Sequence, residues 1–461
     1  MRPAIAVMLL AGCTGAGCPT DAGQDSTQDD SAGCGTACDD TSGDSDTATI
    51  PFDVCGDGLD NNGNGETDEA GCVTAWLEGG YATQGLPDYL TVAPNDSAVW
   101  AYSATAADYW STVGGMALTA ESGSLLPLWS TPGGGRPLVA ALRLDVGATV
   151  VYSTADANSS DHLTVANVPG AGEPASDPQA IDSFDVGVDG VIEDLFSLDA
   201  WPDGDAVRLA VGTWLGHAYV ATDALSSTGS MAERADLTVS YPDDPDNLQE
   251  FGRAVAFLPD SGGDGVPELV VGAPGAVETT GGSAVFIFDG ALQGMVSTED
   301  ADAVIAPTHG AGYGWSITRL GDIDGDGYDD LAVGDPSLAT EIWFGPFTGS
   351  TTPDDVQVVG GWAVAGEFSV NGDDAPDLAV AGLDDAIHLF AGPIQRASYS
   401  YDDADYVIET PGLDFDSSSQ LIFADADGNG TNELVVGDSK FGTDGVTGGP
   451  GLIAVYDLSA L

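Results

Sequence analysis

Basic residues are the scarcest feature of this chain. Its 461 residues include 9 Lys and Arg against 74 Asp and Glu, which gives a net charge of −65, and Lys440 is the only lysine. A nucleic-acid-binding surface needs clustered Lys and Arg to neutralise phosphates, so no nucleic-acid partner is predicted. An anionic membrane surface would also repel the chain. Bound calcium would offset part of the self-repulsion of these carboxylates, and the remaining acidic residues predict a solvated acidic surface.

Catalytic signatures are also missing. The sequence has no HExxH, no GxSxG elbow, no P-loop and no GxGxxG between a strand and a helix. All six cysteines precede residue 73, so the remainder of the chain has no cysteine nucleophile. Paired carboxylates can hydrolyse glycosides, but no pair stands out among 74 acidic residues. We therefore predict no enzymatic activity, with an extracellular hydrolase of polysaccharide or phosphoesters as the alternative.

Long apolar runs are absent too, and none approaches the ~20 residues of a membrane-spanning helix. Residues 1–12 have one positive charge, an apolar core and small residues at the end, which is typical of a signal peptide. The sequence "LAGC", Leu10 to Cys13, resembles a bacterial lipobox, which implies cleavage before Cys13 and a lipid anchor to the membrane on its sulfur. An ordinary secretion signal cut nearby is the alternative. Both predict a protein of the bacterial cell surface, an outer-membrane lipoprotein or a secreted protein.

Residues 13–52 are rich in Asp, Ser, Thr and Gly and contain no Lys or Arg. Such a segment cannot bury enough surface to fold, so an extended acidic tether is predicted. Residues 53–72 form a short cysteine-flanked element, and residues 73–461 form the main domain. Three tether cysteines have no assigned partner: a local bridge between Cys34 and Cys38 would leave Cys18 odd, and the pairing stays open.

The cysteine-flanked element has the spacing of a calcium loop. Such loops supply oxygen ligands from positions 1, 3 and 5, from a backbone carbonyl at 7, and from 9, with glycine at 6. It resembles the "DGxDNxxxGxxDE" modules of bacterial surface proteins. A Cys55–Cys72 disulfide would stabilise it by ~3 kcal/mol, and a disulfide loop without metal is the alternative. Its candidate ligands are Asp60, Asn62, Asn64, the Glu66 carbonyl and Asp68.

The clearest metal-binding pattern is "GDIDGDGYDDLAVGDP", residues 321–336. Glycine occupies position 6 of the loop, where a sharp turn is required, and a short apolar strand follows. An acidic surface turn without an ion is the alternative. The predicted ligands are Asp322, Asp324, Asp326, the Tyr328 carbonyl and Asp330.

Related loops depart from this pattern to different degrees. The loop at 425–433 matches the ligand spacing almost as well. The loop at 260–268 has Gly262 at position 3 and is predicted to bind calcium with a water in place of that ligand. The loop at 369–377 is predicted to be either a weak calcium site or empty. A further loop has Arg208 in place of the last carboxylate and is predicted to hold no metal. The candidate ligands are Asp425, Asp427, Asn429, Thr431 carbonyl and Glu433; Asp260, Asp264, Val266 carbonyl and Glu268; and Ser369, Asn371, Asp373 and Asp377.

The strand after the loop recurs through the chain. Copies begin at Leu90, Leu138, Leu209, Leu269, Leu331, Leu378 and Leu434. Each is followed by one or two further runs of β-branched or aromatic residues, and an apolar run often precedes the loop. Each unit is therefore predicted to form four short strands. Such units bury their faces by repetition around an axis, which predicts an all-β, seven-bladed β-propeller, with six or eight blades as alternatives. The last unit lacks its fourth strand, and residues 73–77 are predicted to supply it.

The loop at 322–336 and the dipeptides Phe251-Gly252 and Tyr313-Gly314 resemble the FG-GAP repeats of the integrin alpha-chain β-propeller. The resemblance is strong in the last four copies and weak in the first three, and Ser369 and Arg208 depart from it. It implies calcium on the face away from the ligand-binding loops and a domain that binds proteins or matrix.

Together these features predict a calcium-binding FG-GAP β-propeller at the cell surface or secreted, which mediates adhesion by binding an extracellular protein or glycan. A structural surface protein without a specific ligand is a further alternative. Tryptophans can line a sugar site, although core packing is their commoner role; the candidates are Trp100, Trp110, Trp201, Trp214, Trp315 and Trp362.

Overall fold

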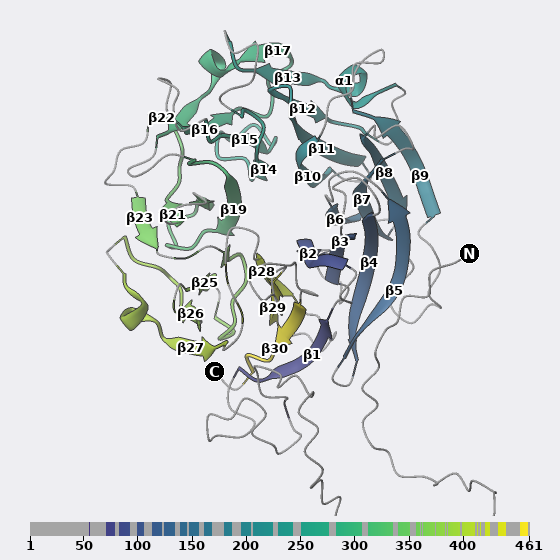
Figure 1. Ribbon diagram of the computed structural model, residues 1–461. Coiled ribbons are helices and arrows are strands. Elements are labelled where there is room, and N and C mark those ends of the chain that lie inside the picture. The colour runs from purple at the N-terminus through teal and green to yellow at the C-terminus, as the bar shows by residue number, and fades with distance from the viewer. Residues whose placement is uncertain are drawn as a thin grey trace, which may run out of the picture. The chain divides into compact units, whose positions relative to one another are not determined.

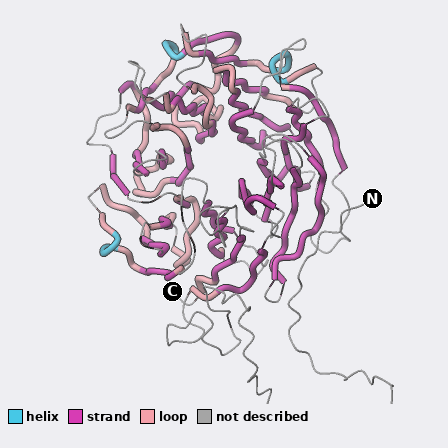
Figure 2. The backbone as a smooth tube through the Cα atoms, viewed as in Figure 1, coloured by secondary structure: helices cyan, strands magenta, loops and turns pink. Residues whose placement is uncertain are grey.

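The computed structural model describes residue 55 and, with gaps, residues 71–459. The chain divides into two units, Met1–Ile50 and Pro51–Leu461, and every described residue belongs to the second. The described residues form strands β1 to β30 and three short helical turns: α1 (Met231–Arg234), η1 (Thr298–Asp300) and η3 (Tyr401–Asp403). Figure 2 shows strands joined by loops, with few helical turns. The all-β prediction is confirmed.

The described strands form seven sheets of four or five strands, each built mainly from consecutive antiparallel strands (Figure 1). The first sheet contains β2 (Thr83–Val92), β3 (Val99–Thr105), β4 (Val113–Glu121) and β5 (Ser124–Gly133). The second contains β6 (Val139–Leu144), β7 (Gly147–Ala155), β8 (Asp161–Asn167) and β9 (Gln179–Asp185).

The third and fourth sheets each carry a fifth strand, which comes from the following part of the chain and pairs in parallel. The third contains β10 (Leu195–Asp203), β11 (Ala206–Thr213), β12 (His217–Ala221), β13 (Leu237–Ser240) and β17 (Gly294–Ser297). The fourth contains β14 (Val255–Leu258), β15 (Glu268–Ala273), β16 (Ala284–Phe288), β18 (Ala303–Ile305) and β22 (Gly349–Ser350). These added strands were not predicted from the sequence.

The last three sheets return to four strands. The fifth contains β19 (Ser316–Gly321), β20 (Asp330–Gly334), β21 (Thr340–Trp343) and β23 (Val356–Val359). The sixth contains β24 (Val364–Ala365), β25 (Leu378–Ala381), β26 (Ala386–Phe390) and β27 (Tyr406–Glu409). The seventh contains β28 (Gln420–Ala424), β29 (Glu433–Asp438), β30 (Leu452–Tyr456) and β1 (Val73–Glu78).

The seventh sheet joins the two ends of the domain. Strand β1 pairs antiparallel with β30, with Trp76 opposite Ala454 and Glu78 opposite Leu452. Val73 is fully buried, and its burial adds apolar contact to the backbone pairing. The predicted contribution of residues 73–77 to the last unit is therefore confirmed.

The first strands of successive sheets lie against one another. Strand β6 contacts β2 and β10, β14 contacts β10 and β19, and β24 contacts β19 and β28. Strand β28 also contacts β2, so the sequence of contacts returns to its start. Each sheet is thus placed next to the sheets that precede and follow it in the chain.

Glycines allow two pairs of successive sheets, the third with the fourth and the fourth with the fifth, to approach each other closely. A Cβ added to Gly272 on β15 would lie 2.1 Å from the carbonyl oxygen of Gly314, and one on Gly212 of β11 would lie 1.9 Å from that of Gly252. Gly252 and Gly314 have φ near +90°, a conformation that favours glycine. The Phe-Gly and Tyr-Gly dipeptides are therefore contact points between successive sheets.

The repeat alignment predicted for the first two units is wrong by one strand. The apolar runs at Leu90 and after Leu138 fall on β2 and β6, which are the first strands of their sheets, whereas the runs at Leu209 and beyond fall on second strands. Residues 145 and 146 alone join β6 to β7, so that unit has no acidic loop to mark its second strand.

Candidate metal site

The loop between β19 and β20 brings three of its five predicted ligands together. Carboxylate oxygens of Asp322, Asp324 and Asp330 all lie within 4.8 Å of one another. Among the described residues, this is the group of His, Cys, Asp and Glu side chains whose geometry suits a metal ion. The sequence spacing and the folded geometry therefore select the same loop.

The loop folds through hydrogen bonds from its own backbone to its carboxylates. Gly327 N donates to Asp322 Oδ2 at 2.9 Å, Asp326 N donates to Asp324 Oδ1 at 3.1 Å, and Tyr328 N donates to Asp326 Oδ1 at 3.0 Å. Gly327 has φ +97°, a value that a side chain would strain. Alternating aspartates thus wrap the backbone around a common centre.

Asp330 anchors the loop to the sheet. Its side chain is fully buried, and it accepts hydrogen bonds from Ile323 N at 2.9 Å and from Gly345 N at 2.8 Å. Burial raises the pKa of Asp330 to about 7, the two hydrogen bonds oppose that shift, and the charges of Asp324 and Asp326 add to it. A positive charge beside these carboxylates would favour their ionised forms.

The donor set fits a hard divalent cation. Asp322 Oδ1 is buried without a hydrogen-bond partner, so one oxygen of the cluster is desolvated and not satisfied by protein. Calcium prefers carboxylate and carbonyl oxygens and takes about 6–8 of them. Tyr328, whose carbonyl is the fourth predicted ligand, is 40% exposed, which leaves that side of the loop open to water ligands.

Asp326 is the predicted ligand outside this group, and it faces an arginine from the next sheet. Arg396 Nη2 lies 2.8 Å from Asp326 Oδ2, and Arg396 Nε lies 2.6 Å from Asp324 Oδ2. The same Nη2 donates to the Gly345 carbonyl at 3.1 Å. Sequence reasoning missed Arg396, because it lies 72 residues after Asp324 and belongs to no repeated motif.

The loop between β14 and β15 also folds through backbone hydrogen bonds to its own carboxylates, but it has Gly262 at the third ligand position. Asp260 accepts hydrogen bonds from the backbone of residues 263–265, and these bonds lower the pKa of Asp260. Glu268 Oε1 accepts from Ser261, while Glu268 Oε2 is buried without a hydrogen-bond partner. In this loop Asp264 is exposed and Val266 is half-buried, and Asp264 Oδ1 accepts from Val266 N at 2.8 Å.

In the loop between β24 and β25, the last carboxylate is held as in the loop at Asp322, but the first ligand position lacks a carboxylate. Asp377 accepts from Val370 N and Gly392 N at 2.7 and 2.8 Å, as Asp330 accepts from Ile323 and Gly345. Ser369 Oγ, at the first ligand position, instead donates to Asn371 Oδ1 at 3.1 Å, and its distance to Asp373 Oδ1 is 3.4 Å. The first three positions here bond to one another.

Arg208 on β11 stands where the last carboxylate of a loop would be. It is buried, and its Nη2 lies 3.2 Å from Asp203 Oδ2. A cation therefore already pairs with an acidic residue at this position.

Several predicted site residues lie outside the described residues. Of the predicted ligands in the loop after β28, only Glu433 is described, and it is buried at the start of β29. Cys13 and the ligands between Cys55 and Cys72 also lie outside; the undescribed candidates are Asp425, Asp427, Asn429, Thr431, Asp60, Asn62, Asn64, Glu66, Asp68 and Cys13.

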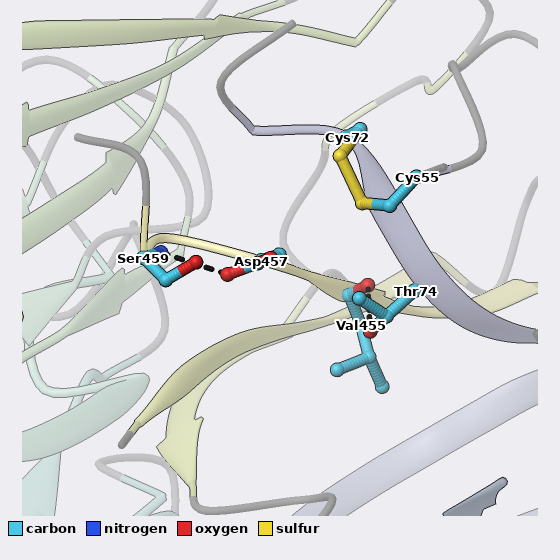
Figure 3. The surroundings of a disulfide bond; sticks show 6 residues. All are labelled: Cys55, Cys72, Thr74, Val455, Asp457 and Ser459. Carbon is cyan, nitrogen blue, oxygen red and sulfur yellow. Dashed lines mark hydrogen bonds between the residues drawn. A yellow bond between two sulfur atoms is a disulfide. The ribbon is translucent and has the colours of Figure 1, made fainter. Parts of the chain in front are cut away.

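The cysteines on either side of the predicted calcium loop at 60–68 are bonded to each other. Cys55 and Cys72 form a disulfide, and Cys55 N donates to the Val73 carbonyl at 3.1 Å. Figure 3 shows the disulfide at the start of β1, beside the Thr74–Val455 hydrogen bond to β30. The bridge therefore fastens residue 55 to the strand that completes the seventh sheet.

A cluster of aromatic rings lies at the opposite ends of the strands. Trp214 is 50% exposed in the turn between β11 and β12, and its ring centroid lies 5.0 Å from that of Phe196. Arg253, just before β14, lies 3.8 Å from the centroid of Trp315 and 5.4 Å from that of Phe196. The acidic loops follow the first strands, whereas Arg253 and Trp315 precede them, so the two features occupy opposite ends of the sheets.

Comparison with known proteins agrees with this geometry. Residues 313–343, which include the whole loop with Asp322, match the FG-GAP repeat family. Integrin alpha-PS5 of Drosophila melanogaster is 38% identical over 92 residues, which cover 19% of this chain and 9% of that protein. The segment with the folded loop is therefore similar to an FG-GAP repeat.

Other similarities are partial or remote. Phosphatidylinositol-glycan-specific phospholipase D of Bos taurus is 38% identical over 88 residues, which cover 19% of this chain and 10% of that protein. The chain thus spans about a tenth of the length of the curated relatives it matches. The crystal structure of Sqt1 from Chaetomium thermophilum aligns over 84% of this chain and 90% of its own, at 14% identity and a TM-score of 0.46.

Proposed function

We propose that this protein is a calcium-stabilised, seven-bladed β-propeller of the cell surface or extracellular space that binds a protein or glycan ligand. The observation that carries the proposal is the group of Asp322, Asp324 and Asp330, folded on a segment that matches the FG-GAP repeat. The seven sheets and the contacts among their first strands support the blade count. Pairing of β1 with β30 supplies the closure such a ring requires.

Calcium is the proposed ion because the ligands are oxygens and the loop is open to water. Asp322, Asp324, Asp326, Asp330 and the Tyr328 carbonyl would hold it, and the ion would neutralise carboxylates that otherwise repel one another. The loop at Asp260 is proposed as a second site, with Glu268 Oε2 as the buried oxygen that lacks a partner. The loop at Ser369 is proposed to be weak, because Ser369 replaces the first carboxylate.

The ligand is proposed to bind at the strand ends opposite the acidic loops. Trp214 and Leu215 are 50% and 45% exposed there, next to the stacked Arg253 and Trp315. Aromatic rings with exposed faces stack on sugars or on apolar side chains. None of the described helices is long and apolar enough to cross a membrane. Attachment to the membrane is proposed to come from a lipid on Cys13.

A binding screen tests the proposal. Purified protein is applied to immobilised extracellular glycans and matrix proteins in calcium and again in EGTA. We expect calcium-dependent binding to at least one of them, and Trp214→Ala should weaken it at least tenfold. Met295→Ala, at an 87% exposed apolar residue on β17 of the same sheet and outside every predicted metal loop, serves as the matched control. Binding to none of the ligands in calcium would contradict the adhesive role, and turnover of a polysaccharide or phosphoester would favour a hydrolase instead.

A further inference from the structure

The cation nearest to the candidate metal site belongs to the protein itself. Arg396 follows β26 in the sixth sheet and reaches the loop between β19 and β20 in the fifth. Its guanidinium contacts Asp324 and Asp326 at 2.6 and 2.8 Å and lies 4.9 Å from the centroid of Phe344. Two predicted calcium ligands are therefore already paired with a positive charge.

We propose that Arg396 is a built-in competitor of calcium at this loop. The proposal rests on the calcium site proposed above. A carboxylate oxygen that bonds a guanidinium at 2.6 Å offers fewer lone pairs to an ion, and the two positive charges repel each other at this distance. Calcium binding must therefore displace the guanidinium from Asp324 and Asp326, and its affinity is lowered by the free energy of that pairing.

The side chain can leave without unfolding the segment that carries it. Arg396 is 39% exposed, so its guanidinium has access to water. Ile394, two residues earlier, is buried in the core shared by the fifth and sixth sheets and donates its N–H to the Ile323 carbonyl at 2.6 Å. Pro393 lies 3.7 Å from a Cβ built on Gly325. These contacts hold the backbone against the loop, so that only the arginine side chain has to move.

The arrangement gives the loop two stable states. Without calcium, Arg396 neutralises part of the charge on the aspartates and joins two sheets. With calcium, the ion takes over neutralisation and Arg396 is released to solvent. Among the described loops, neither the one at Asp260 nor the one at Ser369 has an ion pair to Lys or Arg within 4.0 Å. The pairing with an arginine therefore distinguishes the loop at Asp322 from these two related loops.

Calcium titration calorimetry on the full chain tests this inference with the variants Arg396→Gln and Arg396→Lys. We expect Arg396→Gln to raise the calcium affinity of one site by about tenfold, equivalent to about 1.4 kcal/mol. Arg396→Lys should give a smaller increase, because it keeps the charge but loses the planar fork. Arg208→Gln removes the same charge from the third sheet and should leave the affinity unchanged. Equal affinities in wild type and Arg396→Gln would overturn the competition.

Stability measurements separate competition from a purely structural role. In EGTA, Arg396→Gln should be less stable than wild type, because the aspartates lose their counter-charge. In saturating calcium the difference should vanish, whereas an arginine needed only for packing would cost the same stability in both conditions. The variant Asp322→Asn, made in wild type and in Arg396→Gln, identifies the site: a calcium count unchanged by it in both backgrounds would refute calcium at this loop, and with it the proposed function there.

Discussion

The raised pKa of Asp330 leads to a specific prediction about pH. The carboxyl is fully buried, and burial, together with the charges of Asp324 and Asp326, raises its pKa from 3.8 to about 7. The folded protein in EGTA therefore holds this proton more tightly than the unfolded chain does. The corresponding stability is fully present below about pH 4 and is lost as pH rises to about 7. A difference of about 3 pKa units corresponds to about 4 kcal/mol of unfolding free energy.

The comparison variant is Asp330→Asn, which cannot ionise. Because the whole chain carries a net charge of −65, its stability in EGTA should fall with rising pH for many reasons, and only the difference between wild type and variant reports on residue 330. Urea unfolding at pH 5, 6, 7 and 8 in EGTA should show wild type losing more stability than the variant across this interval.

Calcium should remove this effect. The ion favours the ionised carboxylate, so binding near pH 7 should release a proton, and wild type should gain stability from calcium while Asp330→Asn gains less. Parallel pH profiles for the two proteins in EGTA would refute the argument from burial. Equal gains from calcium would instead show that Asp330 contributes nothing to an ion site.

Three further predictions concern the ion, the bridge and the anchor. Asp324→Ala should lower the number of bound calcium ions by about one, measured by equilibrium dialysis with atomic absorption; an unchanged count would show this loop to be empty. Reducing the Cys55–Cys72 disulfide, or replacing both cysteines by Ser, should destabilise the domain by ~3 kcal/mol in urea unfolding, and no loss would mean that this bridge does not constrain the unfolded chain. Cys13→Ala should abolish partitioning into the detergent phase, and a variant that still partitions would contradict lipidation.

The sequence predicted those parts of the fold whose signal is local. The motifs beginning at Leu209, Leu269 and Leu331 each end in Gly-Thr, Gly-Ala or Gly-Asp after an apolar run, and each forms the buried second strand of its sheet. The runs at Leu90 and Leu138 carry the same residue types without a preceding acidic loop, and the alignment there is off by one strand. Apolar alternation identifies a strand but not its place in a sheet.

What the sequence could not predict depends on contacts between distant segments. The parallel strands β17 and β22 extend sheets that lie earlier in the chain, and short runs such as Gly294–Ser297 give no hint of their partner. Arg396 is one of few basic residues, yet only the fold shows that it lies against Asp324 and Asp326. The metal loop itself was predictable because all its ligands lie within nine residues.

The pairing of β1 with β30 has a consequence for how the protein is made. Strand β1 has no partner until residues 452–456 have been made, so the seventh sheet is the last that can be completed during synthesis. Until then the edges of β1 and β29 are unpaired, and exposed strand edges promote aggregation. Contacts across such a sequence separation also slow folding. A nascent chain of this protein therefore needs protection until its final strand emerges, and truncation before Leu452 should be far more damaging than the loss of a similar length from a surface loop.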